Sequence, residues 1–279
     1  MRKEDAELIA PEALAAELGR PGLRLVDATW IAPAQGLDPR ASHAEARLPG
    51  AVFFDIDRVA TPSGDVPHML PDAETFAAGV GALGIGPEDH VVVYDQSGVA
   101  SAASRAWWTF LHFGQRRVSL LDGGLPAWRA ARLPVETGRA APAAVDRPAT
   151  PGRLPVLDRA AVLAGLAGGT PLVDARSPER HAGAGPEPWG EPGRIPGSVN
   201  LPYAELLDAH GRLLPDDELR RRVDAAALPA APGGVYCGSG VTACVVIFAL
   251  ARLGRGTPAL YDGSWAEWVR TPGSPRERD

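Results

Sequence analysis

Cysteine is scarce in this chain, which has two cysteines, Cys237 and Cys244, among 279 residues. Two thiols exclude both a framework of several disulfides and a metal site built from several cysteines. We therefore expect no metal site. If a cysteine matters for function in this chain, it matters as a reactive thiol.

Long apolar segments and clusters of basic residues are also missing. No stretch approaches the roughly 18 uncharged apolar residues of a membrane span, and the first residues lack the apolar centre of a signal peptide. The formal net charge is -6 and no run of lysine or arginine occurs. These absences argue against nucleic-acid and membrane partners and favour a cytoplasmic protein.

What the sequence does contain is an internal repeat. Four short motifs in the first half, at 25–28, 47–51, 90–95 and 121–124, recur in the same order at 172–175, 194–198, 234–237 and 261–264. Such self-similarity predicts two copies of one domain. A segment rich in alanine and proline near the middle lacks any apolar period and predicts a linker. We expect an N-terminal domain at 1–138, a linker at 139–152 and a C-terminal domain at 153–279.

Each copy alternates short Val/Leu/Ile runs with helical patterns, such as those at 102–113 and 242–253. This alternation predicts an α/β fold in which a mostly parallel sheet is flanked by helices. Ligands of such folds bind at the carboxyl ends of the strands. Reactive side chains are therefore expected directly after the predicted strands.

The loops that follow the matched strands at 90–94 and 234–236 differ in one chemical respect. The first begins with Asp95 and the second with Cys237, which is followed by Gly238, Ser239 and Gly240. Glycines let successive N–H groups turn toward the sulfur, and the helix that follows favours a thiolate. The pattern predicts that Cys237 is reactive. The alternative is that Cys237 is only a small buried core residue. Cys244, on an apolar helical stretch, is predicted to be a packed core thiol.

The segments that carry these features resemble the two-domain rhodanese superfamily, and specifically its 3-mercaptopyruvate sulfurtransferases. The matching segments are CGSGVTAC, DARSPERHAG, PGRIPGSVNLP, PHMLP, SRAWW, LLDGG and LYDGSWAEW. The resemblance implies two tandem rhodanese-like domains and sulfur transfer through the cysteine. Thiosulfate-specific relatives typically have Arg and Lys in the loop, so the neutral Gly-Ser-Gly favours 3-mercaptopyruvate, which has a single carboxylate.

The resemblance also implies roles for other residues. Arg180 occupies the position of an arginine that binds the substrate carboxylate, with a surface or interdomain ion pair as the alternative. A second family arginine is replaced by Trp189, and Arg194 is a candidate for the missing cation. The loop residues Gly238, Gly240, Val241 and Thr242 are expected to contact substrate. Ser239 is expected to act as a hydrogen-bond donor or in a proton relay with His68 and Asp57, with a simple turn residue as the alternative.

The implied reaction starts with attack of the Cys237 thiolate on the donor's sulfur and gives a persulfide. A thiol acceptor, such as thioredoxin or a small thiol, or cyanide then removes the outer sulfur, and no cofactor is needed. A thiosulfate sulfurtransferase and a non-catalytic sulfur carrier or regulatory module are the alternatives. A phosphatase with a Cys-x5-Arg loop is disfavoured because Ala243 stands at the arginine position.

Overall fold

The structure is a computed structural model that describes residues 6–60, 66–98 and 100–279. It contains two five-stranded sheets, one in each half of the chain, with strand orders β1-β5-β4-β2-β3 and β6-β10-β9-β7-β8. All pairings in both sheets are parallel. The two strand orders correspond position by position, so the predicted repeat of a parallel α/β unit is confirmed.

The elements of the first half follow one another in the order expected for alternating strands and helices. Its strands are β1 (Glu7–Ile9), β2 (Leu23–Asp27), β3 (Val52–Phe53), β4 (His90–Tyr94) and β5 (Arg117–Leu121). Its helices are α1 (Pro11–Ala15), η2 (Pro33–Gln35), α2 (Pro39–Glu45), α3 (Ile56–Val59), α4 (Ala73–Gly81), α5 (Ser101–His112) and α6 (Gly124–Ala130).

The second half repeats this order. Its strands are β6 (Val156–Leu157), β7 (Leu172–Asp174), β8 (Val199–Asn200), β9 (Gly234–Tyr236) and β10 (Leu260–Tyr261). Its helices are α7 (Arg159–Ala167), α8 (Pro178–Ala182), η3 (Tyr203–Leu206), α9 (Asp216–Ala225), α10 (Ala243–Arg252) and α11 (Ser264–Arg270).

Local sequence explains the central elements. The β-branched run of β4 is buried on both faces, as expected for a central parallel strand. Aspartates cap several helices, and the Asp55 carboxylate accepts the N–H groups of Asp57 and Arg58 at the start of α3. After α10 the chain turns at Gly254, whose φ of +70° suits glycine. The helices predicted at 102–113 and 242–253 are confirmed as α5 and α10.

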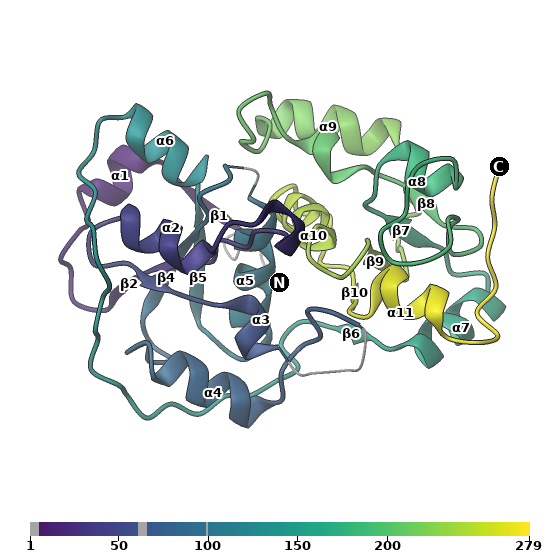
Figure 1. Ribbon diagram of the computed structural model, residues 1–279. Coiled ribbons are helices and arrows are strands. Elements are labelled where there is room, and N and C mark those ends of the chain that lie inside the picture. Colours follow the sequence, from purple (N-terminus) through teal and green to yellow (C-terminus); the bar gives the residue numbers. More distant parts are fainter. Residues whose placement is uncertain (1–5, 61–65, 99) are drawn as a thin grey trace.

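The two halves meet along α5 and α10, which lie between the sheets (Figure 1). Trp107 of α5 and Phe248 of α10 form an edge-to-face pair with ring centroids 4.9 Å apart. One cluster of buried apolar residues runs continuously through both halves. The carboxyl ends of the two sheets are therefore held in a fixed relation by a shared core.

The segment 139–152 contains no helix or strand and runs along the first half. The Val145 N–H donates to the Gly81 carbonyl, and the buried Arg147 donates to the Gln115 side chain at 3.0 Å. The domain limits expected from sequence stay a prediction. Among the described residues, no helix combines the length and apolar character needed to cross a membrane.

Candidate active site

Cys237 is the first residue after β9 and lies in a cavity of about 720 Å³ between the two halves. We call this the Cys237 cavity. Seven other residues predicted from sequence also line it: Asp57, His68, Arg180, Gly238, Ser239, Val241 and Thr242. Trp30, Trp189 and Tyr203 add aromatic walls. Because Cys237 is only 1% exposed, a reactant must enter this cavity to reach the sulfur.

Hydrogen bonds between the Cys237 backbone and the first two residues of α11 fix the position of Cys237. Its N–H donates to Ser264 Oγ at 3.1 Å, and its carbonyl accepts the Trp265 N–H at 3.0 Å. Gly240 has a φ of +76°, and a Cβ there would lie 2.7 Å from the Asp262 carbonyl oxygen. Only glycine fits at this turn, which brings the chain from β9 to α10.

The matching loop of the first half shows what its backbone can bind. The Asp95 carboxylate accepts hydrogen bonds from the N–H groups of Ser97 at 3.1 Å and Gly98 at 3.0 Å. Burial raises the pKa of this carboxyl above its usual value. Gly98 has a φ of +74°, close to the +76° of Gly240, so the two turns have similar backbones. The first loop thus encloses its own acidic side chain, at the position where the second has the Cys237 thiol.

A hydrogen-bonded chain leads from Ser239 across the cavity. His68 Nδ1 lies 3.0 Å from Ser239 Oγ, and His68 Nε2 lies 3.1 Å from Asp57 Oδ1. The Trp30 indole N–H donates to Asp57 Oδ2 at 2.9 Å. Burial opposes ionisation of Asp57, but the contacts with His68 and Trp30 outweigh it and lower the pKa of this carboxyl. The carboxylate is therefore suited to orient the imidazole toward the hydroxyl.

Arg105 of α5 holds the two sides of the Cys237 cavity together. Its Nη2 donates to the His68 carbonyl at 2.7 Å and to Asp262 Oδ1 at 2.7 Å. The other Asp262 oxygen accepts the Leu70 N–H at 2.8 Å. His68 has a φ of +60°, which is unfavourable for a non-glycine residue and is maintained here by these contacts.

Sequence inspection assigned no role to Arg105 or Asp262, although both fall in segments that carry the family resemblance. The sequence nevertheless contains a usable signal for Arg105, because an arginine in an otherwise apolar helix must find a partner when it is buried. Arg105 is 1% exposed and Asp262 is 4% exposed.

Arg180 reaches the cavity from α8 and is held by a buried acid. Its Nε and Nη2 donate to the two oxygens of Glu187 at 3.0 and 2.7 Å. Glu187 also accepts from Arg176 Nη1 at 2.9 Å, so one carboxylate lies between two guanidinium groups. This geometry fixes the direction of Arg180 and offsets part of its charge.

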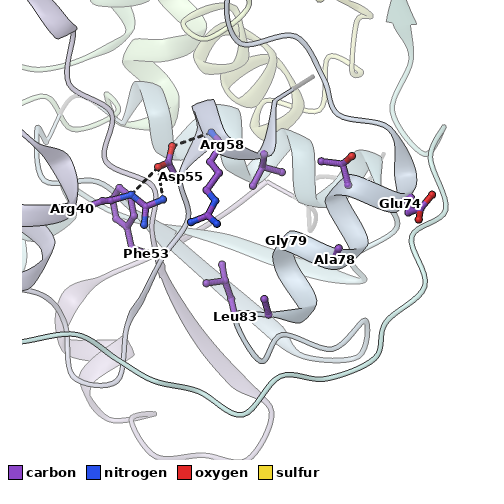
Figure 2. A pocket seen from close by; sticks show the side chains of 11 residues that line it. Arg40, Phe53, Asp55, Arg58, Glu74, Ala78, Gly79 and Leu83 are labelled. Atoms are coloured by element: carbon purple, nitrogen blue, oxygen red, sulfur yellow. Dashed lines mark hydrogen bonds and ion pairs between the residues drawn. The ribbon is translucent and has the colours of Figure 1, made fainter. Parts of the chain in front are cut away.

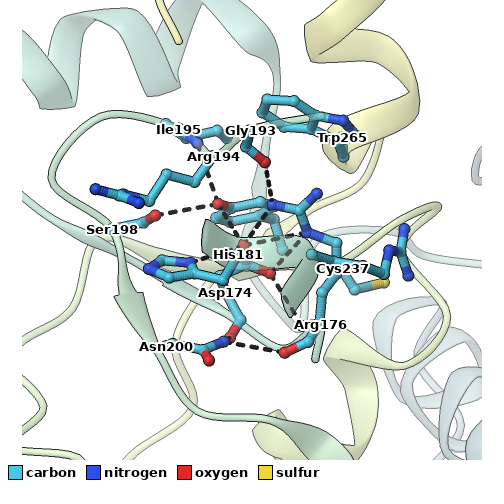
Figure 3. A network of polar contacts seen from close by, with 12 residues as sticks. Asp174, Arg176, His181, Gly193, Arg194, Ile195, Ser198, Asn200, Cys237 and Trp265 are labelled. Carbon is cyan, nitrogen blue, oxygen red and sulfur yellow. Dashed lines mark hydrogen bonds and ion pairs between the residues drawn. The ribbon is translucent and has the colours of Figure 1, made fainter. Parts of the chain in front are cut away.

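Arg176 belongs to a buried network at the end of β7 (Figure 3). Its guanidinium donates to Asp174 at 2.6 Å, and His181 Nδ1 and the Tyr236 hydroxyl also contact the same carboxylate. Burial opposes ionisation, but His181 and Arg176 lower the pKa of Asp174 to about 2. The network anchors the segment that presents Arg180 and Glu187.

Trp189 covers the loop at Gly238. A Cβ on Gly238 would lie 2.4 Å from Trp189 Nε1 and 3.0 Å from Arg180 Nη2. The indole therefore packs directly on the glycine backbone and forms one wall of the cavity. Glycine is needed here for close approach of a side chain.

Two residues that were expected to contact substrate lie outside the lining of the Cys237 cavity. Arg194 does not line the Cys237 cavity: its Nη1 donates to Asp279 at 2.7 Å, because residue 194 pairs with residue 277 of the C-terminal segment. Figure 3 shows its side chain extending away from Cys237. Gly240 is also not a lining residue, since its carbonyl points to Arg105 and to the Cys244 thiol.

Cys244 lies in the core of α10 and its thiol donates to the Gly240 carbonyl at 3.4 Å. Burial raises the pKa of this thiol to about 12. The predicted packed core position is confirmed. In the described part of the chain, no group of three or more His, Cys, Asp or Glu side chains is arranged to hold a metal ion.

Known proteins are similar to this chain over most of its length. The family model for the rhodanese-like domain matches residues 10–131 and 158–271. The chain is 39% identical to human 3-mercaptopyruvate sulfurtransferase, over 94% of this chain and 90% of that protein. It is 36% identical to the mitochondrial thiosulfate/3-mercaptopyruvate sulfurtransferase 1 of Arabidopsis thaliana, over 97% of this chain and 78% of that protein.

A solved structure of a 3-mercaptopyruvate sulfotransferase from Escherichia coli superposes with a TM-score of 0.85 at 34% identity. The match covers 92% of this chain and 98% of that chain. The similarity therefore extends over both sheets and the cavity between them.

Proposed function

We propose that this chain, which belongs to the rhodanese-like family, is a sulfurtransferase that carries sulfur from 3-mercaptopyruvate as a persulfide on Cys237. One observation carries the proposal: a single cavity holds the Cys237 thiol, the Ser239–His68–Asp57 chain and the Arg180 guanidinium. A nucleophile, a group that can move a proton and a cation for a carboxylate are what this transfer needs.

In the first step the Cys237 thiolate attacks the sulfur of 3-mercaptopyruvate and forms a sulfur–sulfur bond. The carbon–sulfur bond of the donor breaks, and its electron pair stays on carbon as the enolate of pyruvate. The enolate takes up one proton and leaves as pyruvate, while Cys237 keeps the outer sulfur. By analogy with the Asp95 loop, the N–H groups of Ser239 and Gly240 stabilise the negative sulfur.

Ser239 and His68 supply hydrogen bonds and the proton in this proposal. The Ser239 hydroxyl faces the donor's carbonyl or enolate oxygen, and His68 relays a proton through it. Asp57 keeps the imidazole in place, and its lowered pKa means that it stays ionised at neutral pH. A positioned proton donor of this kind contributes roughly 10²–10⁴-fold to a rate.

The preference for 3-mercaptopyruvate rests on charge. Arg180 is the one arginine or lysine among the described residues that line the Cys237 cavity, and Glu187 already accepts two of its hydrogen bonds. A single partly neutralised cation suits one carboxylate better than the two negative charges of thiosulfate. Trp189 adds an apolar wall that also disfavours a small dianion.

The second step regenerates the thiol. An acceptor thiolate attacks the outer sulfur, the persulfide sulfur–sulfur bond breaks, and Cys237 leaves as a thiolate. Thioredoxin or a small thiol is the proposed acceptor, and no cofactor, nucleic acid or membrane takes part. A cytoplasmic location is part of the proposal; the Arabidopsis relative, by contrast, is named as mitochondrial.

The test compares kcat/KM for 3-mercaptopyruvate and thiosulfate, with cyanide as acceptor, in the native chain and in Cys237→Ser. We expect a higher value for 3-mercaptopyruvate in the native chain and no transfer in Cys237→Ser. Mass spectrometry after exposure to the donor alone should find one added sulfur on the peptide that contains Cys237.

Cys244→Ser is the matched control, since it removes the other thiol and should leave transfer intact. Transfer by Cys237→Ser would refute the persulfide step. A higher kcat/KM for thiosulfate would keep that step and overturn the donor. Absence of both transfer and added sulfur would favour a non-catalytic binding module.

A further inference from the structure

A second cavity lies in the N-terminal half between α3 and α4 and shares no lining residue with the Cys237 cavity. We call it the α3–α4 cavity. Its volume of about 610 Å³ falls in the range of about 300–1,000 Å³ that is usual for small-molecule sites. Phe53, Val59, Ala78 and Leu83 give it a largely apolar lining (Figure 2). Its size and lining suit a small molecule with an apolar body.

Arg58 supplies a cation to this cavity. Its guanidinium makes no hydrogen bond or ion pair with any residue that the structure describes. Its backbone N–H donates to Asp55 Oδ1 at the start of α3. Figure 2 shows the side chain extending from α3 toward the space between Phe53 and α4, whereas Glu74 points away from that space. Arg58 is exposed, and a guanidinium at the edge of an apolar cavity that has no partner among the described residues favours a carboxylate or a similar anion.

Arg40 adds a second guanidinium on the same side. Its Nε and Nη2 donate to Asp55 Oδ2 at 3.0 and 2.6 Å, and its guanidinium lies over the Phe53 ring at 5.4 Å from the centroid. The side chain is 41% exposed, so an anion in the cavity can compete with Asp55 for it. The two arginines together suit the two oxygens of one carboxylate.

Asp55 connects this cavity to the Cys237 cavity. While Oδ2 accepts from Arg40, Oδ1 accepts the N–H groups of Asp57 and Arg58 at 3.1 Å each and so caps α3. Asp57 is the residue whose carboxylate contacts His68. An anion that drew Arg40 away would change how Asp55 is held, and thereby the position of Asp57.

We propose that the α3–α4 cavity binds a small organic monoanion with an apolar body, and that binding lowers sulfur transfer through Arg40, Asp55 and Asp57. The binding part is independent of the proposed function, whereas the effect on transfer rests on it. The ligand class is an aliphatic or aromatic carboxylate that places its charge at Arg58 and Arg40 and its apolar part against Phe53 and Leu83.

The test uses 4-phenylbutyrate as the probe and isothermal titration calorimetry as the direct measurement. We expect saturable binding that weakens on the order of fivefold in Arg58→Gln, the loss of one partly exposed charge pair. Ala78→Phe should abolish binding because the larger side chain fills the cavity from an exposed helix position. Arg129→Gln, an exposed arginine on α6, is the matched control and should bind like the native chain.

Sulfur transfer is then measured with and without the probe. We expect the probe to lower kcat in the native chain, and Arg40→Gln to have a reduced kcat that no longer responds to the probe. Absence of binding, or binding that Arg58→Gln and Ala78→Phe leave unchanged, overturns the site. Binding without any effect on kcat overturns the coupling. A chain that binds the probe but transfers no sulfur contradicts the proposed function and leaves the binding result standing.

Discussion

Gly238→Ala should destabilise the protein because of a single neighbouring side chain. The added Cβ would lie 2.4 Å from Trp189 Nε1 and 2.9 Å from Trp189 Cδ1, whereas carbon and nitrogen atoms in contact are normally about 3.5–4.0 Å apart. The indole must therefore move by about 1 Å or more, and Arg180 Nη2, at 3.0 Å, must also shift. Overpacking of this kind costs about 1–3 kcal/mol.

The cost should disappear when the indole is removed. Gly238 does not have a positive φ, so alanine is compatible with its backbone. In a Trp189→Ala background the same change should be neutral or stabilising by up to about 1 kcal/mol, because alanine restricts the unfolded chain. The double-mutant cycle should thus give a coupling of at least about 1 kcal/mol between these two positions.

The assay is urea unfolding followed by far-ultraviolet circular dichroism, together with sulfur transfer by each variant. Gly165→Ala, inside α7, is the matched control: the atom nearest its Cβ is 3.9 Å away, so we expect no destabilisation. Transfer should fall in Gly238→Ala because Trp189 and Arg180 both line the Cys237 cavity. The predicted clash with Trp189 would be refuted if Gly238→Ala had the same urea midpoint as the native chain. It would also be refuted if Trp189→Ala did not relieve the loss of stability.

Two further predictions concern buried groups. Burial raises the pKa of the Cys244 thiol to about 12, so iodoacetamide at pH 8 should modify Cys237 and spare Cys244. Peptide mass spectrometry measures the modification of each cysteine in the folded protein, and equal modification of both would contradict this prediction. Arg105→Met leaves Asp262 buried without its cation and should lower the free energy of unfolding by about 3–5 kcal/mol. The exposed control Arg129→Met should change the free energy of unfolding by less than about 0.5 kcal/mol. Equal urea midpoints for these two variants would show that the Arg105–Asp262 pair does not stabilise the interface.

Both copies of the repeat contribute side chains to the Cys237 cavity. The second copy contributes Cys237 and Arg180, while the first contributes His68 and Asp57 from the other side of the interface. The first copy has Asp95 at the position that matches Cys237, and this carboxylate accepts hydrogen bonds from its own loop. One copy thus provides the thiol, and the other provides groups that line the same cavity.

The sequence by itself determined the repeat, the parallel α/β fold, and the strand–loop–helix unit that presents Cys237. These features depend on residues close together in the chain: β-branched runs, glycines that allow tight turns, and apolar helical periods. The same local patterns identified which copy has the thiol. Cys244 was also recognisable as a core residue because it lies on an apolar helix.

Only the tertiary structure decided which distant side chains meet. Arg105 and Asp262 are 157 residues apart, and their contact depends on how α5 and α10 pack across the interface. Arg194 has the right charge for the cavity, yet the isolated bridge between residues 194 and 277 directs its side chain to the C-terminal acids. Charge pairing of this kind has no local sequence pattern, because it is fixed by the packing of elements far apart in the chain.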